Sequence, residues 1–233
     1  MNLALDNKVV IVSGGASGIG AAVVSILASE GAIPFILDST LPPAELLART
    51  GAPAQIVDFA DTTACAAAVQ RVASRFGRID ALVNGAHSVP EAGETEPVFA
   101  SATRNLTHCH LMTQACLPHL RRTRGSIVSI ASQASLELDE SASHVATKAG
   151  IVGLTREWAA LLAKDGIRVN AVIPTATATA SRLHRAAPLP GGPVGTDEIA
   201  NVTAFLLSER AGPTSGQWLY IEDNYQPSAR SMA

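Results

Sequence analysis

Short apolar runs alternate with longer segments of helical periodicity along most of this 233-residue chain. Within most of each run the apolar residues are consecutive, which is typical of strands covered on both faces in a parallel sheet. The predicted strands are residues 8–12, 33–37, 54–57, 80–84, 126–130, 167–173 and 218–221.

Three of the segments between these strands place apolar residues on one face of a helix. We expect these faces to pack in a core rather than to contact a cofactor. Alternation of strands and helices over nearly the whole chain predicts βαβ units. The expected fold is a doubly wound, Rossmann-like parallel α/β sheet of about seven strands with helices on both faces. The three faces are formed by Cys65, Val69, Val72 and Phe76; by Leu106, Cys109, Thr113, Cys116 and Leu120; and by Ile151, Leu154, Trp158 and Leu161.

The length and the continuity of the pattern predict one dinucleotide-binding and catalytic domain over residues 1–233. Residues 174–196 are rich in Pro, Thr, Ala and Gly and break the alternation, so we expect a short loop on the substrate side. Residues 228–233 are expected to form a loose C-terminal tail.

Composition and charge exclude several other classes of protein. With 17 basic and 20 acidic residues the net charge is −3, which provides no field that would attract nucleic acid. The longest uncharged stretch, residues 9–29, contains four glycines, so we expect no membrane span, and the N-terminus has no signal-peptide pattern. Cys65, Cys109 and Cys116 lack metal-ligand or C-x-x-C spacing and are expected to be buried thiols in a cytoplasmic protein without a metal site.

A glycine-rich turn, S-G-G-A-S-G-I-G at residues 13–20, follows the first predicted strand and opens a helix. At such a turn the free N–H groups and the positive dipole end of the helix can bind a pyrophosphate. The spacing is G-x-x-x-G-x-G rather than G-x-G-x-x-G, so the signal depends on this strand–helix context. The candidate phosphate-binding residues are Gly14, Ser17, Gly18, Ile19 and Gly20.

Asp38 ends the second predicted strand, 38 − 20 = 18 residues after the last glycine of the turn. A carboxylate at this place can accept hydrogen bonds from both ribose hydroxyls of an adenosine. The alternative is that Asp38 is an ordinary turn residue at a strand end.

Several further motifs, in register with these two, resemble the short-chain dehydrogenase/reductase family. The likeness extends from about residue 8 to residue 221 and follows the order of the family's motifs. It implies an NAD(P)-dependent oxidoreductase that acts on a small-molecule alcohol or carbonyl substrate. The motifs are Asp58-Phe59 after the third strand, Asn84-Gly85-Ala86 after the fourth, Asn105 in a long helix, Ser132 after the fifth, H-V-A-T-K at residues 144–148, and Pro174 with Thr179 after the sixth.

The resemblance also implies roles in cofactor binding. Asp58 would bind the adenine amino group with Phe59 nearby, and Asn84, Gly85 and Ala86 would line the adenine ribose. Pro174, Thr177 and Thr179 would cover the nicotinamide and the diphosphate. Ser17 and Ser39, rather than a basic residue, flank the site of Asp38, and a 2′-phosphate beside Asp38 would meet like charge, so we expect NAD rather than NADP.

The family's reaction uses Asn, Ser, Tyr and Lys, and this chain matches three of the four with Asn105, Ser132 and Lys148. The tyrosine exchanges the proton of the alcohol, the serine holds the substrate oxygen, and the lysine binds the nicotinamide ribose. At the tyrosine position, one helical turn before Lys148, stands His144. Neutral imidazole can accept the proton of an alcohol, so His144 is either a changed catalyst or a sign of lost catalysis.

Three hypotheses therefore stay open at this stage. The chain is a dehydrogenase with His144 as base, an NAD-binding sensor or assembly subunit without activity, or an enzyme whose tyrosine is Tyr220 or Tyr225. Two further departures, His87 where the family has glycine and His108 one turn after Asn105, are read as structural side chains. By family resemblance we also expect a homo-oligomer, a dimer or tetramer, with Leu111, Ala115 and Trp158 as candidate contacts.

Overall fold

The computed structural model describes residues 2–87, 102–132, 142–174 and 194–221, with side chains from residue 105 and from residue 145 onward in the second and third ranges. Most of the expected substrate-side loop, residues 174–196, and the whole of the expected tail, residues 228–233, lie outside these ranges.

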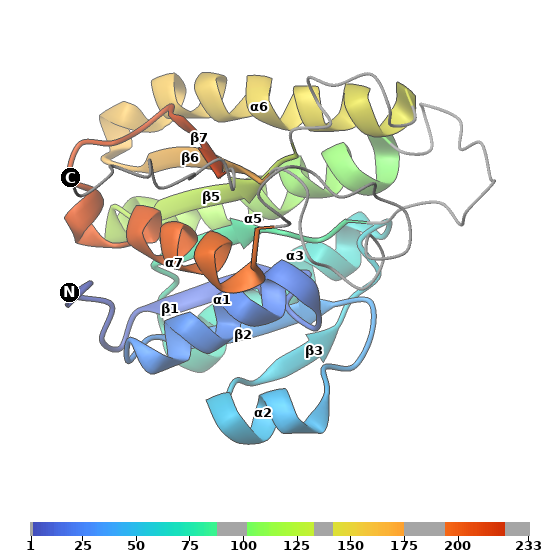
Figure 1. Ribbon diagram of the computed structural model, residues 1–233, viewed down its shortest axis with the longest axis vertical. Helices are drawn as coiled ribbons and strands as arrows, with labels where there is room; N and C mark the ends of the chain where they lie inside the picture. The colour runs from blue at the N-terminus through green and yellow to red at the C-terminus, as the bar shows by residue number, and fades with distance from the viewer. Residues whose placement is uncertain (1, 88–101, 133–141, 175–193, 222–233) are drawn as a thin grey trace, which may run out of the picture.

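Seven parallel strands form one sheet in the order β3-β2-β1-β4-β5-β6-β7, which confirms the expected doubly wound fold (Figure 1). Each end of each strand lies within one residue of its predicted place. The strands are β1 (Val9–Ser13), β2 (Ile33–Asp38), β3 (Ala54–Ile56), β4 (Ala81–Asn84), β5 (Ser126–Ile130), β6 (Arg168–Pro174) and β7 (Trp218–Ile221).

Helices cover both faces of the sheet. One face carries α3 (Thr62–Phe76), α5 (His108–Thr123) and α6 (Ala142–Leu162), and the other carries α1 (Gly18–Ser29), α2 (Ala44–Thr50) and α7 (Thr196–Leu207). In Figure 1, α1 and α7 lie side by side in front of the central strands. Shorter helical turns are η1 (Ala102–Thr107), which is π-helical, and the 3₁₀ turns η3 (Ala163–Asp165) and η4 (Glu209–Ala211).

Consecutive residues of each central strand enter opposite cores. Val9 and Ile11 pack with α3, α5 and α6, while Val10 and Val12 pack with α1, α2 and α7. Burial on both faces explains why the strands are apolar at successive positions. The predicted helix faces are likewise in the core, except that Leu161 is 56% exposed, so the prediction is wrong there. The core stripe of α6 continues from Trp158 by a step of four residues to the buried Leu162.

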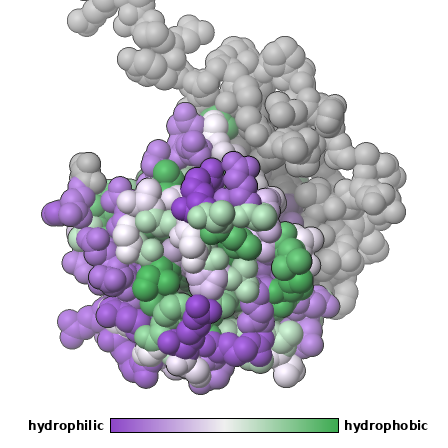
Figure 2. All heavy atoms as spheres, turned by 90° about the horizontal axis from the view of Figure 1, so that it is seen from below, coloured by the Kyte–Doolittle hydropathy of each residue, from purple (hydrophilic) through white to green (hydrophobic). Residues whose placement is uncertain are grey.

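The end of the molecule that carries β3 and α2 has a mixed surface. Figure 2, which views this end from below, shows hydrophilic residues around scattered hydrophobic ones. Ile56, at the end of β3, and Leu41, in the loop after β2, are both exposed. None of the described helices is long and apolar enough to cross a membrane.

The order of the strands reverses between β1 and β4. The chain proceeds from β1 outward through β2 and β3 on one side, and from β4 through β5, β6 and β7 on the other. Loops that leave two such neighbouring strands diverge, which opens a crevice at the carboxyl ends of the strands, where ligands bind in folds of this type. The glycine-rich turn follows β1 and Asn84 ends β4, so both predicted motifs lie at this crevice.

Candidate active site

The glycine-rich turn passes very close to the loop after β4. Gly14 has a φ of +74°, and a Cβ atom there would lie 2.6 Å from the main-chain N and Cα of Ala86. A Cβ at Gly20 would overlap the carbonyl oxygen of Gly14. Glycine is therefore required at both positions, by sterics at Gly20 and by sterics and conformation at Gly14.

The N-terminus of α1 offers its main-chain N–H groups to the crevice. Ser17 is the N-cap residue, and no described side chain caps the helix there. The first turn of α1 carries no acidic residue, and both Ser17 and Gly18 are exposed. Free N–H groups and the positive end of the helix dipole favour an anion at this place. The turn thus fits a diphosphate.

The Asp38 carboxylate is held between two loops. It accepts hydrogen bonds from the Ala16 N–H at 2.9 Å, from the Thr40 N–H at 3.2 Å and from the Thr40 hydroxyl at 3.3 Å. The side chain is buried; Oδ1 takes both bonds from Thr40, whereas Oδ2 takes the bond from Ala16 and keeps a second acceptor site. The carboxylate is therefore fixed in place, and its Oδ2 atom can still accept a hydrogen bond from a ribose.

Asn84 faces the interior rather than the crevice. Its side-chain amide donates to the Thr113 hydroxyl on α5 at 3.2 Å, and the residue is buried. The Ser13 hydroxyl donates to the Val83 carbonyl and accepts from the Gly85 N–H, both at 3.2 Å. Ser13 and Asn84 thus fix the start of the loop after β4, whose Ala86 main chain approaches Gly14.

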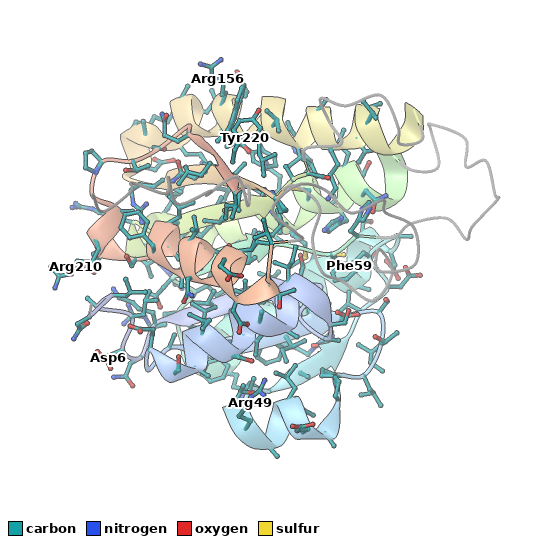
Figure 3. All side chains as sticks on the ribbon, viewed as in Figure 1. Asp6, Arg49, Phe59, Arg156, Arg210 and Tyr220 are labelled. Carbon is teal, nitrogen blue, oxygen red and sulfur yellow. The ribbon has the colours of Figure 1, made fainter. Side chains whose placement is uncertain are left out.

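Asp58 and Phe59 follow the carboxyl end of β3, at the same edge of the sheet as the glycine-rich turn. Asp58 is exposed and accepts a hydrogen bond from the Ala60 N–H at 2.9 Å. The Phe59 ring lies with its centroid 5.1 Å from that of the buried His108. In Figure 3, Phe59 lies on the side of the molecule opposite Asp6 and Arg210. Asp58 is therefore accessible to a ligand, while His108 packs in the interior.

Lys148, on α6, reaches the carboxyl end of β5. Its Nζ donates a hydrogen bond to the Ile130 carbonyl at 3.1 Å, and only 5% of the residue is exposed. Burial lowers the pKa of Lys148 to about 8. The nearby Cys109 would oppose this shift only as a thiolate, but burial raises the pKa of that thiol to about 12, so it is neutral at neutral pH. The crevice thus contains a buried amine whose charge is disfavoured by its surroundings.

Asn105 lies in η1, between the loop after β4 and α6. The residue is 1% exposed, and the Nδ1 atom of His87 is 3.0 Å from its Oδ1 atom. The next residue, Leu106, packs on α6 so closely that a Cβ atom at Gly150 would lie 2.9 Å from Leu106 Cδ2. Asn105 is therefore held from both sides.

The remaining predicted residues are placed in part. Ser132 is half-buried two residues after β5, and Pro174 is the buried last residue of β6. His144 lies in α6 one turn before Lys148, but its side chain is outside the described part of the chain. Thr177, Thr179 and Tyr225 also lie outside the described residues, whereas Tyr220 is 44% exposed on the edge strand β7.

The described residues contain no group of three or more His, Cys, Asp or Glu side chains that could hold a metal ion. Cys65, Cys109 and Cys116 are buried free thiols, as expected. For Cys116, burial alone raises the pKa, so this thiol is inert at neutral pH.

Sequence reasoning missed the roles of three residues that build the site, Ser13, Thr40 and Thr113, and one contact, the pairing of His87 with Asn105. Thr40 stands two residues after Asp38, so its hydroxyl could have been suggested as a partner of that carboxylate. The bonds of Ser13 to Val83 and Gly85 join residues far apart in sequence and follow from the tertiary structure. Thr113 was assigned to a helix face in the core, and the structure adds its bond to Asn84. The pairing of His87 with Asn105, 18 residues apart, follows from the tertiary structure alone.

Comparison with known proteins assigns this arrangement to a family. Residues 8–187 match the profile of the short chain dehydrogenase family, which covers more than half of the chain. The chain belongs to this family and is an oxidoreductase of the kind that acts on alcohols or carbonyls with a nicotinamide cofactor.

Individual relatives agree over nearly their whole length. The chain is 36% identical to the D-threitol dehydrogenase of Mycolicibacterium smegmatis, over 95% of this chain and 94% of that protein. It is 31% identical to the meso-2,3-butanediol dehydrogenase of Serratia marcescens, over 91% of each. The structure resembles that of a 3-ketoacyl-(acyl-carrier-protein) reductase from Brucella melitensis complexed with NADH, with a TM-score of 0.83, 28% identity, and coverage of 95% of this chain and 99% of that one.

Proposed function

We propose that this protein is an NAD-dependent dehydrogenase of secondary alcohols, with vicinal diols as the first substrate class to test. Its catalytic residues are Ser132, His144 and Lys148, and Asn105 supports them. The diol class is suggested by D-threitol and meso-2,3-butanediol, the compounds that name two relatives.

The cofactor is held by residues whose geometry fits it. The N–H groups of the glycine-rich turn and of the first turn of α1 bind the diphosphate, because no described side chain competes for them. Asp38 accepts hydrogen bonds from the adenine ribose, and Asp58 lies accessible for the adenine. Pro174, Thr177 and Thr179 complete the nicotinamide side. When bound, the oxidised nicotinamide supplies the hydride acceptor of the reaction.

The protein's own residues handle the proton and the orientation of the alcohol. Neutral His144 accepts the hydroxyl proton of the alcohol as the carbon gives up its hydride, so that a carbonyl and an imidazolium result. Ser132 holds the reacting oxygen. The positive charge of Lys148, one turn from His144, favours the neutral imidazole that this step requires.

One observation carries the nicotinamide-binding part of this proposal: the Lys148 amine is buried at the crevice although burial disfavours its charge. A charged group in that position destabilises the free protein unless a ligand uses it, which is typical of active sites. Two hydroxyls of a ribose would give this amine the partners that the Ile130 carbonyl alone does not. The competing proposal, a dinucleotide-binding protein without turnover, explains Lys148 but not Ser132.

We also propose a homo-oligomer, with the outer surfaces of α5 and α6 as the contact. Leu111 and Ala115 are half-buried and Leu161 is exposed on these helices, whereas Trp158 is buried in the core of the chain itself and contributes little to a surface. Apolar side chains on a helix surface are stabilised when a symmetric partner covers them.

The test of the function is a panel of vicinal diols, sugars and simple secondary alcohols, each offered with NAD while the absorbance of the reduced nicotinamide is followed. Turnover of at least one diol supports the proposal. Submillimolar NAD binding with no turnover on any compound would favour the binding protein.

A further inference from the structure

His87 makes a hydrogen bond that fixes where its proton is. Its Nδ1 atom lies 3.0 Å from Oδ1 of Asn105. An amide oxygen can only accept a hydrogen bond, so the proton must be on Nδ1. When the ring is neutral, Nε2 then carries the lone pair.

His119, on the outer part of α5, shows the opposite arrangement. Its Nδ1 atom is 3.1 Å from a guanidinium nitrogen of Arg122, and a guanidinium can only donate. The proton of neutral His119 is therefore on Nε2. Burial and the Arg122 charge lower the pKa of His119, which keeps this ring neutral at neutral pH. His119, with its proton on Nε2, can therefore serve as the reference for His87, with its proton on Nδ1.

The partner of His87 lies in a segment whose conformation needs support. Asn105 belongs to η1, a π-helical segment directly before α5. Such segments are rare and are frequent at functional sites. On its other side η1 packs on α6, where Leu106 meets Gly150, two residues from Lys148. The bond from His87 therefore joins the loop after β4 to the segment that borders Lys148.

We propose that His87 is a positioning residue of the active site: it donates its Nδ1–H to the Asn105 side chain and so holds η1 in place beside the helix that carries Lys148. A glycine at this position, as the family usually has, could not make this bond. The effect on turnover rests on the proposed function, whereas the protonated nitrogen of His87 can be measured without any substrate.

The first experiment is a nitrogen-15 spectrum of the imidazole rings in the cofactor-free protein at a pH where the rings are neutral. We expect His87 with its proton on Nδ1 and His119 with its proton on Nε2. In Asn105→Ala, His87 should lose the Nδ1–H state while His119 keeps its own. Signals are assigned through their loss in His87→Asn and in His119→Asn. A wild-type His87 with its proton on Nε2 would overturn the proposal.

The second experiment measures kcat and KM for His87→Phe and His87→Asn. Phenylalanine keeps a ring without a donor, and we expect kcat to fall about tenfold, the effect of one lost hydrogen bond. The KM for NAD should change less than about twofold, since the diphosphate contacts of the glycine-rich turn and the contact of Asp38 with the adenine ribose are untouched. Asparagine brings a side-chain N–H close to the place of Nδ1–H and should restore kcat to within about threefold of wild type.

Equal kcat values in wild type and both variants would overturn the positioning role, as would equal losses in both at unchanged melting temperature. If the wild type oxidises no substrate, it is the proposed function that fails, and the nitrogen-15 spectrum decides the proposal for His87.

Discussion

Nζ of Lys148 donates to the Ile130 carbonyl oxygen at 3.1 Å while the surrounding protein excludes water from the amine. This contact brings the N-terminal third of α6 to the carboxyl end of β5, beside the strand that leads to the loop of Gly85 and Ala86. The amine is thus in place before any ligand arrives. An active site that is organised in this way loses stability in the free protein in exchange for function.

Replacing Lys148 by methionine should stabilise the cofactor-free protein at pH 7. The pKa of Lys148 is lowered to about 8 in the folded protein from 10.5, so between these values the unfolded chain binds more protons and the stability of the wild type rises with pH. Below about pH 8 the buried Lys148 amine is charged, so it destabilises the folded wild-type protein by the full amount. We expect a net gain of about 2 kcal/mol in the free energy of unfolding. This figure already includes the loss of the hydrogen bond to Ile130.

Urea unfolding at several pH values measures this gain, which should disappear above about pH 10.5. Lys164→Met, at an exposed position on η3, is the matched control and should change little. A methionine variant that is less stable than wild type at pH 7, or a gain that is independent of pH, would contradict the interpretation.

Asp38 should make the protein select NAD. The carboxylate is fixed by Ala16 and Thr40, so it cannot turn away from a 2′-phosphate, and two negative charges at contact cost several kcal/mol. We expect NAD to bind at least about tenfold more tightly than NADP by calorimetry. Asp38→Asn should narrow this ratio, while Asp165→Asn, distant in the fold, should not. Equal affinities of the wild type for both cofactors would refute the assignment.

Gly14→Ala and Gly77→Ala form a matched pair. The two glycines have nearly the same φ, +74° and +72°, but a Cβ at Gly77 meets nothing within 4 Å, whereas one at Gly14 meets the Ala86 main chain. Gly77→Ala should therefore show only the backbone cost of about 1–2 kcal/mol in the free energy of unfolding and leave NAD affinity unchanged.

Gly14→Ala should cost at least about 2 kcal/mol more than that and weaken NAD binding at least about tenfold, because the turn and the loop after β4 must separate. Chemical unfolding and calorimetry on both variants check this. The same losses in both variants would mean that the close approach of these loops is not needed.

The fold could be predicted closely because its signals are local. Apolar strands buried on both faces and helices with one apolar face appear directly in the pattern, and the seven strands follow it. Leu161 was the exception: steps of three and of four residues both keep a residue near the core face, and only the packing of α6 decides between Leu161 and Leu162.

The site could be predicted only where a motif lies within one segment. The glycine-rich turn and Asp38 follow from their place after β1 and β2. The π-helical turn at Asn105 leaves no known mark in the residues themselves, because it depends on how η1 packs between the loop after β4 and α6. The pKa of Lys148 likewise depends on burial by distant segments.

The oligomer predicts a second matched pair. Light scattering at micromolar concentration should give a mass well above the 24.0 kDa of one chain. Leu161→Glu, on α6, should shift the protein toward the monomer, because a charge would be buried at the contact. Leu41→Glu, at a position 74% exposed near β3, should not. A monomeric wild type would contradict the proposed assembly.

The central claim is that His144 accepts the proton of the alcohol, and its most direct test compares turnover of one active diol by wild type, His144→Ala and His144→Tyr with NAD in excess. Turnover by the wild type should rise with pH as the imidazole loses its proton, and the alanine variant should lose about 100-fold or more in kcat with NAD affinity intact. The tyrosine variant should keep activity, because a phenol serves in the family, and His119→Ala should match wild type. Equal kcat for wild type and His144→Ala on a substrate that is turned over would contradict the account.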